Sequence, residues 1–335
     1  MIVTLTANPS LDRTVELPGA LARGEVQRAV AVHQHSGGKG VNVSRALVAS
    51  GLDTVAVLPG GDSDPVLAGL LADGVPYAAL PISEPLRSNV TLTEPDGVTT
   101  KINEPGPELS PDEQEALIGL LLERSRGASW VVLAGSLPPG VPADFYATVA
   151  RRLRSVDNPA NDGGAPLIAI DSSGAPLAAS IGGNADGETS GKPDLLKPNA
   201  EELAELAAAA GFANVHTADE LEADPGLAAK AAAAVVESGV GAVLATLGSK
   251  GAVLVTADGA WLATHPPIQA VSTVGAGDSS LAGYLLAATR GGSAQDCLRQ
   301  AVAHGAAAAS LPGSTVPAVH QTTPDAVTIT ALQKD

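Results

Sequence analysis

The chain has 335 residues, of which 45% are hydrophobic and only 2% aromatic, so a core of Ala, Val and Leu can fill one large α/β domain or two smaller ones. With 19 basic and 36 acidic residues, the formal net charge is −17. This balance argues against a nucleic acid or an anionic membrane surface as the partner.

In chain order, short apolar runs alternate with helical segments. The runs that we predict as strands of a main sheet are Met1–Thr6, Thr54–Leu58, Trp130–Ala134, Leu167–Ile170, Asp194–Leu196, Ala242–Thr246 and Ala252–Thr256. The segments that we predict as helices are Val41–Ser50, one that ends at Leu71–Ala72, Ala143–Leu153, Ala200–Ala210 and Leu227–Ser238. This alternation predicts an α/β fold with a parallel, doubly wound sheet and right-handed crossovers.

Four further runs alternate polar and apolar residues and predict a separate small sheet. Arg13–Leu17 and Val26–His35 are typical of a hairpin with one dry face. Asn89–Thr93 and Val98–Asn103 form a second pair, with the turn 94–97 between them. We expect these strands to stand together outside the main sheet.

The remaining segments give fewer signals. Two insertions rich in Gly, Asn and Asp, 157–165 and 182–192, are typical of surface loops. The single cysteine, Cys297, excludes an intrachain disulfide and a cysteine-rich metal site, and we expect a buried thiol. No apolar run reaches the length of a membrane span and no leader precedes Ile2, so we expect a cytoplasmic protein.

The stretch 271–286 joins a small-residue turn to an apolar helical segment. Gly275, Ala276 and Gly277 let the backbone approach a ligand closely, and free N–H groups at a helix start form an anion site. Asp278 follows directly, and a carboxylate there suits a base that takes a proton from a hydroxyl group attacking phosphorus. The alternative is that Asp278 is a helix N-cap, a position that favours Asp.

Small-residue turns also follow other predicted strands. Together with 275–277, the turns 37–40, 135–140 and 247–251 indicate an edge of the sheet where two phosphate-bearing molecules meet. Asp12 lies in a turn after the first strand, at the edge where open α/β sheets bind ligands. The chain contains no G-x-x-x-x-G-K-[ST], and no G-x-G-x-x-G follows the first strand.

Several polar residues near these turns have two interpretations. Lys39, flanked by glycines, either contributes a charge to a phosphate site or is a solvated surface lysine. Arg87, which begins an outlying strand with Asn89, either binds a phosphate in a bidentate manner or protects a sheet edge. Asn199 and Glu202, at a helix start, either organise magnesium through water or stabilise the first helical turn. The six histidines show no metal-ligand spacing, and no G-x-S-x-G elbow supports a hydrolase.

Taken together, these motifs resemble the ribokinase-like (PfkB-type) sugar kinases from about Ile2 to Pro312. Residues 273–279 match the family's C-terminal signature and residues 37–43 its N-terminal one. The segments that resemble the bacterial 1-phosphofructokinase and tagatose-6-phosphate kinase branch are 8–14, 87–90, 101–106, 135–140 and 197–199. The resemblance implies a single kinase domain over 1–335 with a Rossmann-like α/β fold, a small β-sheet lid inserted at about 12–35 and 87–103, and a homodimer in which the lids clasp.

The resemblance also implies a reaction, the ATP- and Mg²⁺-dependent phosphorylation of a ketohexose phosphate, with fructose 1-phosphate as the expected substrate. Asp278 is the implied catalytic base, and Gly275, Ala276 and Gly277 form the implied anion hole. The residues implied to bind the sugar phosphate are Asp12, Gly38, Lys39, Asn42, Arg87, Asn89, Asn103 and Ser136. Those implied to line the ATP site are Lys197, Asn199, Thr246, Gly248 and Gly251, with Asn199 and Glu202 organising magnesium.

Other functions stay open at this point. A tagatose-6-phosphate kinase or a 6-phosphofructokinase of the same family needs a similar ketohexose site. Minor-type 6-phosphofructokinases tend to have Gly in place of Lys39 and a Lys near Glu25, which favours the 1-phosphate or tagatose substrate. A non-catalytic sugar-phosphate sensor has no use for Asp278, and a kinase for an unphosphorylated sugar has no use for both Lys39 and Arg87.

Overall fold

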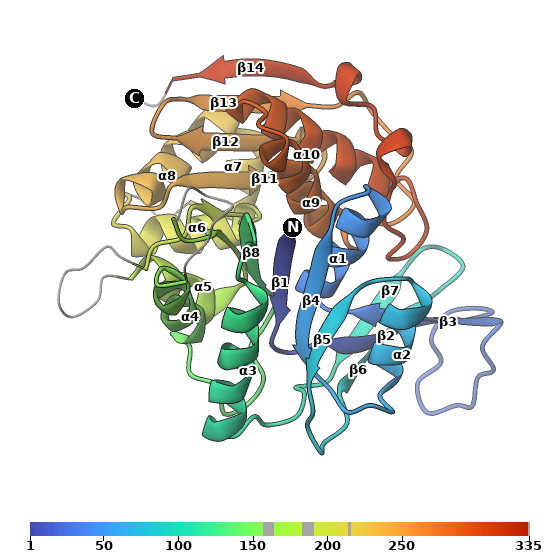
Figure 1. Cartoon of the computed structure of the whole chain (residues 1–335). Helices are drawn as coiled ribbons and strands as arrows, with labels where there is room; N and C mark the ends of the chain where they lie inside the picture. The colour runs from blue at the N-terminus through green and yellow to red at the C-terminus, as the bar shows by residue number, and fades with distance from the viewer. Residues whose placement is uncertain (157–163, 183–190, 214–215, 334–335) are drawn as a thin grey trace.

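The computed structural model describes residues 1–156, 164–182, 191–213 and 216–333. Its main feature is a ten-stranded sheet with the strand order β14-β13-β12-β11-β10-β9-β8-β1-β4-β5 (Figure 1). The strands are β1 (Ile2–Thr6), β4 (Thr54–Pro59), β5 (Tyr77–Leu80), β8 (Trp130–Ala134), β9 (Leu167–Asp171), β10 (Leu195–Leu196), β11 (Ala242–Thr246), β12 (Ala252–Thr256), β13 (Ala260–Thr264) and β14 (Thr328–Leu332). The strands from β5 to β11 pair in parallel, whereas β12, β13 and β14 join as antiparallel neighbours. The predicted doubly wound, mostly parallel sheet is confirmed.

Helices cover both faces of this sheet. One face carries α1 (Lys39–Ala49), α2 (Pro65–Ala72), α9 (Ala276–Thr289) and α10 (Ala294–Ala309). The other carries α3 (Pro111–Arg124), α4 (Phe145–Leu153), α5 (Gly174–Ile181), α6 (Ala200–Ala209), α7 (Ala218–Ala223) and α8 (Pro225–Glu237). Successive strand residues alternate between the two apolar cores: Val131 and Leu133 enter one, Val132 and Ala134 the other. A sheet buried on both faces explains the nearly continuous apolar strands of the sequence.

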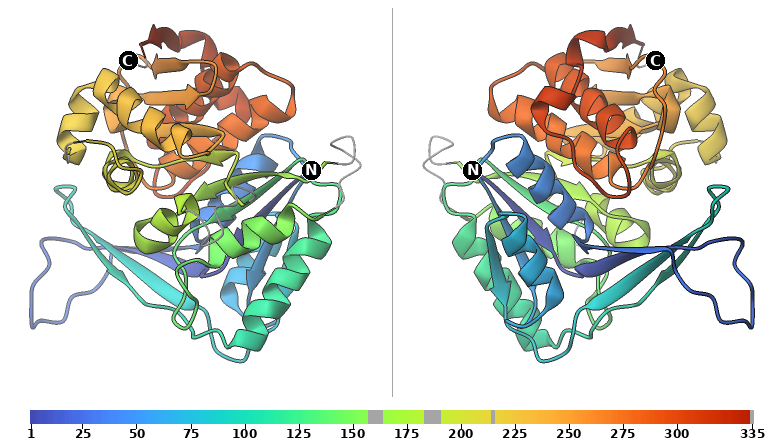
Figure 2. Two further views of the ribbon diagram at one scale, coloured as in Figure 1. Left: turned by 90° about the vertical axis from the view of Figure 1, so that its left-hand side faces the viewer. Right: turned by 90° about the vertical axis from the view of Figure 1, so that its right-hand side faces the viewer.

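The four alternating runs form a second sheet with the order β3-β2-β6-β7. Its strands are β2 (Ser10–Glu16), β3 (Ala31–Gly37), β6 (Arg87–Thr93) and β7 (Thr99–Asn103). Figure 2 shows this small sheet extending away from the body of the molecule. The small sheet was predicted correctly, but two boundaries were wrong. Ser10 pairs with both Gly37 and Arg87, so Asp12 lies inside β2 rather than in a turn, and β3 begins only at Ala31.

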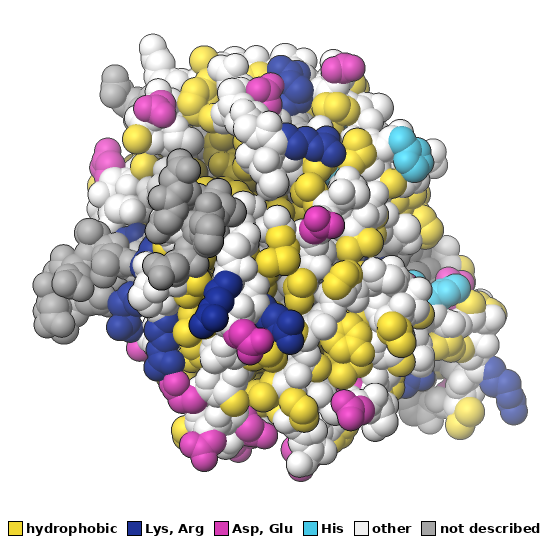
Figure 3. Space-filling view, in the orientation of Figure 1, with side chains coloured by type: hydrophobic (Ala, Val, Ile, Leu, Met, Phe, Trp, Pro, Cys, Tyr) yellow, Lys and Arg dark blue, Asp and Glu magenta, His cyan; other side chains and the backbone are white. Residues whose placement is uncertain are grey.

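Other differences from the prediction are confined to shorter or less patterned elements. We predicted neither the helices α3, α5 and α7 nor the strands β5, β13 and β14. The predicted surface loops 157–165 and 182–192 lie largely outside the described residues. Cys297 is buried in α10 as expected, and its burial raises the pKa of the thiol to about 11. No helix in the described part of the chain combines the length and apolarity that crossing a membrane requires. Figure 3 shows acidic and basic side chains interspersed on one face.

Candidate active site

The glycine turns meet at the carboxyl ends of the parallel strands. Gly38, with φ 110°, precedes α1, and a Cβ there would lie 2.7 Å from Thr6 Cγ2 at the end of β1. A Cβ on Gly40 would lie 2.9 Å from the Leu5 carbonyl oxygen. Only glycine lets the start of α1 pack this closely against β1. Gly135 follows β8 in the same way, with φ 96°.

Asp278 is the third residue of α9, and Gly275, with φ 75°, is the N-cap. The N-cap interpretation of Asp278 is therefore wrong. Its side chain is buried and faces α1, where Asn42 Nδ2 donates a 2.8 Å hydrogen bond to Asp278 Oδ2. Burial, and then the nearby charge of Asp171, raise the pKa of the Asp278 carboxyl to about 6. The first-turn amides of a helix lack partners within the helix, and of those in α9 the N–H of Ala276 donates to Thr273 O at 3.3 Å.

Two lysines share one buried carboxylate beside Asp278. Lys39 Nζ lies 2.7 Å from Asp171 Oδ1 and 3.4 Å from Glu202 Oε1, and Lys197 Nζ lies 3.0 Å from Asp171 Oδ2. Burial opposes the charge on Lys39, but Asp171 and Glu202 outweigh it and raise the pKa of the ammonium group. The interpretation of Lys39 as a solvated surface residue is therefore wrong. Sequence reasoning missed Asp171, although an Asp closing a buried strand was the available signal.

Asn199 and Glu202 form a capping box at the start of α6. Glu202 Oε2 accepts the Asn199 N–H and Asn199 Oδ1 accepts the Glu202 N–H, both at 2.8 Å. The first-turn interpretation of this pair is confirmed. Glu202 Oε1 faces Lys39, so the remaining carboxylate oxygen is directed into the site. Among the described residues, no group of three or more His, Cys, Asp or Glu side chains is arranged to hold a metal ion.

The small sheet contributes an arginine beside the turn that follows β8. Arg87 donates to Asn8 O at 3.0 Å, to Ser136 Oγ at 3.3 Å and to Glu104 O at 3.3 Å. Its strand lies between β2 and β7, so the sheet-edge interpretation is wrong. Lys39 lies near the same turn, since a Cβ added to Gly135 would be 3.9 Å from the Lys39 backbone nitrogen.

Further polar residues of the small sheet lie on one of its faces. Asp12 pairs in register with Asn89, which in turn pairs with Asn103. Asp12 Oδ1 accepts hydrogen bonds from Ser10 Oγ at 2.7 Å and Asn89 Nδ2 at 3.1 Å. Gly37 lies so close to the Asp12 carboxylate that a side chain there would collide with it. Three predicted substrate-binding residues of the small sheet are therefore neighbours: Asp12 and Asn103, which the resemblance assigns to sugar hydroxyls, and Asn89, which it assigns to the phosphate.

The loop after β11 lies beside the segment after β10. Asn199 and Thr246 form an isolated parallel bridge, and Thr246 N donates to Pro198 O at 3.0 Å. Gly248 and Gly251 have φ values of 53° and 98°, and the backbone of Gly251 contacts Ala263 and Thr264.

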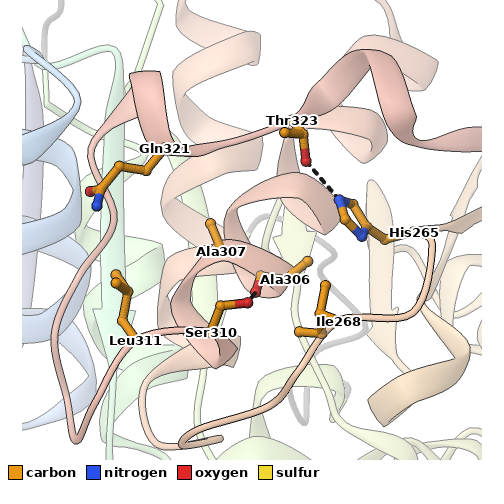
Figure 4. A pocket seen from close by; sticks show the side chains of 8 residues that line it. All are labelled: His265, Ile268, Ala306, Ala307, Ser310, Leu311, Gln321 and Thr323. Carbon is orange, nitrogen blue, oxygen red and sulfur yellow. Dashed lines mark hydrogen bonds between the residues drawn. The ribbon is translucent and has the colours of Figure 1, made fainter.

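A cavity of about 230 Å³ lies beside the C-terminal half of α10 (Figure 4). Its lining includes Ile268, Ala306 and Ala307 as well as His265, which is hydrogen-bonded to Thr323 Oγ1 at 2.7 Å. The cavity is lined by Ile268 of the segment that leads toward the Gly275 turn and by residues of the C-terminal half of α10. It adds a mainly apolar compartment that sequence reasoning missed, because its residues carry no shared motif.

Comparisons with known proteins give one consistent family. The family model described as pfkB family carbohydrate kinase matches residues 6–321. The chain is 34% identical to 1-phosphofructokinase from Rhodobacter capsulatus over 87% of this chain and 84% of the relative. It is 33% identical to ATP-dependent 6-phosphofructokinase isozyme 2 from Mycobacterium tuberculosis over 93% of this chain and 85% of the relative. The crystal structure of phosphofructokinase-2 from Escherichia coli in complex with substrates and products is 30% identical, covers 96% of both chains and superposes with a TM-score of 0.80.

Proposed function

The chain belongs to the pfkB family of carbohydrate kinases, and we propose that this sugar-phosphate kinase transfers the γ-phosphoryl group of ATP to fructose 1-phosphate, which gives fructose 1,6-bisphosphate. One observation carries the proposal most directly. A buried Asp278 stands at a glycine-capped helix start, held by Asn42 and accompanied by Lys39 and Lys197. This set combines a base, helix amides and cations, which in-line phosphoryl transfer requires.

In this mechanism Asp278 removes the proton from the attacking sugar hydroxyl. The hydrogen bond from Asn42 fixes Oδ2 and leaves Oδ1 free to face the substrate. A carboxyl pKa of about 6 keeps the group ionised at neutral pH while making it a better base than an exposed aspartate. The proton moves to Asp278 as the hydroxyl oxygen forms its bond to the γ-phosphorus and the bond to the ADP oxygen breaks.

The charge that develops on the transferred group would be stabilised by the Gly275–Gly277 turn. Helix N-terminal amides and the positive end of the α9 dipole favour an anion there. Lys197 Nζ lies 3.2 Å from a Cβ position on Gly277, so a side chain at 277 would crowd the ammonium group. The lysine and the turn therefore act on the same phosphoryl group.

Lys39, Arg87, Asn89 and Ser136 would bind the phosphate that the substrate already carries. Asp12 and Asn103 would bind sugar hydroxyls from the small sheet, which would act as a lid. Gly38 would let the sugar approach the backbone before α1. Relatives with similar identity carry the names 1-phosphofructokinase and 6-phosphofructokinase, so identity alone does not select the substrate. We propose fructose 1-phosphate because Lys39 stands where the resemblance implies that 6-phosphate enzymes tend to have glycine.

ATP would bind along the segment after β10 and the loop after β11. The residues that we propose to line the nucleotide site are Lys197, Asn199, Thr246, Gly248 and Gly251. The cavity at the C-terminal half of α10, which is lined by both apolar and polar residues, would receive the base. Magnesium accepts one carboxylate together with water and substrate phosphates. The inward Glu202 Oε1 fits that role, with Asn199 fixing the carboxylate, and the ion would supply charge neutralisation on the ATP phosphates.

The outer face of the small sheet suggests a homodimer. Val15 pairs in register with Val32 and Leu92, and Val90 pairs with Ile102, so these apolar side chains share the face opposite Asp12. Val32 is 48% exposed and Ile102 is 56% exposed. A second copy of the same face would bury this patch and clasp the two lids together.

The test is ATP-dependent ADP release with fructose 1-phosphate, fructose 6-phosphate, tagatose 6-phosphate and fructose as parallel substrates. We expect kcat/KM for fructose 1-phosphate to exceed the others at least about tenfold, or about 1.4 kcal/mol of transition-state binding. A preference for tagatose 6-phosphate or fructose 6-phosphate would keep the mechanism and replace the substrate. Tight binding of a sugar phosphate without any ADP release would instead support a sensor.

A further inference from the structure

Asp171 is bound by two lysines that serve different substrates in the proposed reaction. The carboxylate is 0% exposed, and its two oxygens lie 2.7 Å from Lys39 Nζ and 3.0 Å from Lys197 Nζ. The three residues come from the end of β9, the start of α1 and the segment after β10. A buried charge is costly unless it is paired, so the carboxylate and the lysines depend on each other.

The two lysines approach Asp278 from different elements. Lys39 lies three residues before Asn42 on α1, so both side chains lie on the same face of the helix, and Asn42 contacts Asp278 directly. Lys197 approaches the turn before Asp278, at Gly277. One carboxylate therefore joins the cation on the sugar-phosphate side to the cation on the nucleotide side.

We propose that Asp171 is a positioning residue for phosphoryl transfer, whose buried carboxylate holds Lys39 and Lys197 in place beside Asp278. The inference rests on the proposed function for the roles of the two lysines. A lysine is a point charge on a flexible four-carbon chain, and two neighbouring ammonium groups repel each other. A fixed anion between them removes both problems, so the cations are in place before either substrate binds.

Asp171 has a second effect, on the base itself. Its negative charge stands near Asp278 and, after burial, is the next contribution that raises the pKa of the Asp278 carboxyl to about 6. Lys197, the hydrogen bond from Asn42 and Lys39 lower the same pKa. Replacing Asp171 by a neutral residue, with both lysines still beside the site, would therefore lower the pKa of Asp278. The acid limb of the kcat/KM profile would then move to lower pH, a change that a purely structural role does not produce.

The experiment compares Asp171→Asn with Asp194→Asn, which replaces a carboxylate that pairs with Arg154 at 2.9 Å just before β10. Titration calorimetry measures the binding of fructose 1-phosphate and of a non-hydrolysable ATP analogue, and circular dichroism monitors the fold. We expect D171N to weaken both affinities at least about tenfold and to shift the acid limb to lower pH. We expect D194N to bind both ligands like the wild type.

A double-mutant cycle separates positioning from an independent role. If Asp171 acts through Lys39, adding D171N to Lys39→Met should leave the affinity for fructose 1-phosphate unchanged. The same comparison applies if D171N alone is unstable, because the double variant leaves one fewer lysine without its carboxylate partner. A further tenfold loss in the double variant, unchanged binding by D171N, or full recovery of D171N by excess Mg²⁺ would overturn the inference. A wild-type protein that does not bind fructose 1-phosphate would instead contradict the proposed substrate.

Discussion

The two halves of the candidate site differ in how much protein surrounds them. On the main-sheet side, Asp171, Lys197 and Asp278 are 0%, 4% and 8% exposed. On the small-sheet side, Asp12 and Asn89 are only half-buried. The first group stands at strand ends and helix starts within a double-sided core, whereas the small sheet packs little of its own apolar surface. The difference places charge chemistry where water is excluded and geometry is fixed, and sugar recognition where a substrate can enter.

The largest predicted effect comes from removing the base in the buried half of the candidate site. Asp278→Asn removes the base but preserves shape and the neighbouring amides, so kcat should fall by at least about 10³-fold, or about 4 kcal/mol. Steady-state ADP release measures kcat, and calorimetry should find fructose 1-phosphate binding within about threefold of wild type. Equal loss of binding and turnover would assign Asp278 a structural role.

The next largest effect comes from removing the Arg87 guanidinium in the small-sheet half of the candidate site. Arg87→Met removes the guanidinium near Ser136 and should raise KM for the sugar phosphate about 10- to 100-fold, with a smaller change in kcat, because a charge-assisted phosphate contact is lost. Arg28→Met is the control, since Arg28 is exposed in the segment that joins β2 and β3 of the same sheet. A similar KM increase in both variants would show that the sheet, rather than the Arg87 contact, was damaged.

A moderate effect sharpens the link between α1 and the base. The Asn42 hydrogen bond lowers the pKa of Asp278, so Asn42→Ala should raise this pKa and shift the acid limb of kcat/KM upward. At pH 6 the variant should therefore lose more activity, relative to wild type, than at pH 8. The rate ratio at these two pH values is the measurement, and a constant ratio would contradict the proposed coupling.

The smallest effect on catalysis concerns the outer face of the small sheet. Ile102→Lys places a charge on the exposed apolar face and should shift a dimer toward monomer in analytical ultracentrifugation, with kcat changed only a few-fold. Thr99→Lys adds the same charge to the opposite face of the same strand and should leave the oligomeric state unchanged. Identical sedimentation of wild type and both variants would argue against dimerisation through this face.

The elements with strong periodicity could be predicted from the sequence, and so could the turns at which only glycine fits. Gly38 and Gly40 were recognisable because the start of α1 leaves no room for a side chain beside Thr6. Asp171 was not recognised, because its role depends on two lysines that lie 132 and 26 positions away along the chain. The antiparallel strands β13 and β14 were also missed. β14 is mostly exposed, so its sequence lacks the apolar run of a buried strand, and only its pairing with β13 identifies it as a strand.

The pH dependence of kcat/KM for the wild-type protein tests the central claim that Asp278 is a buried catalytic base. A base acts only when deprotonated, so the rate should be level above its pKa and fall about tenfold per unit of pH below it. With the carboxyl pKa at about 6, the profile for fructose 1-phosphate between pH 5 and 8 should bend near pH 6. The second ionisation of the sugar phosphate also lies near pH 6, so the same profile is recorded with the sulfate analogue of the substrate, which has no such ionisation. A bend near pH 6 with both compounds supports the account, and a level profile down to pH 5 with the sulfate analogue would contradict it.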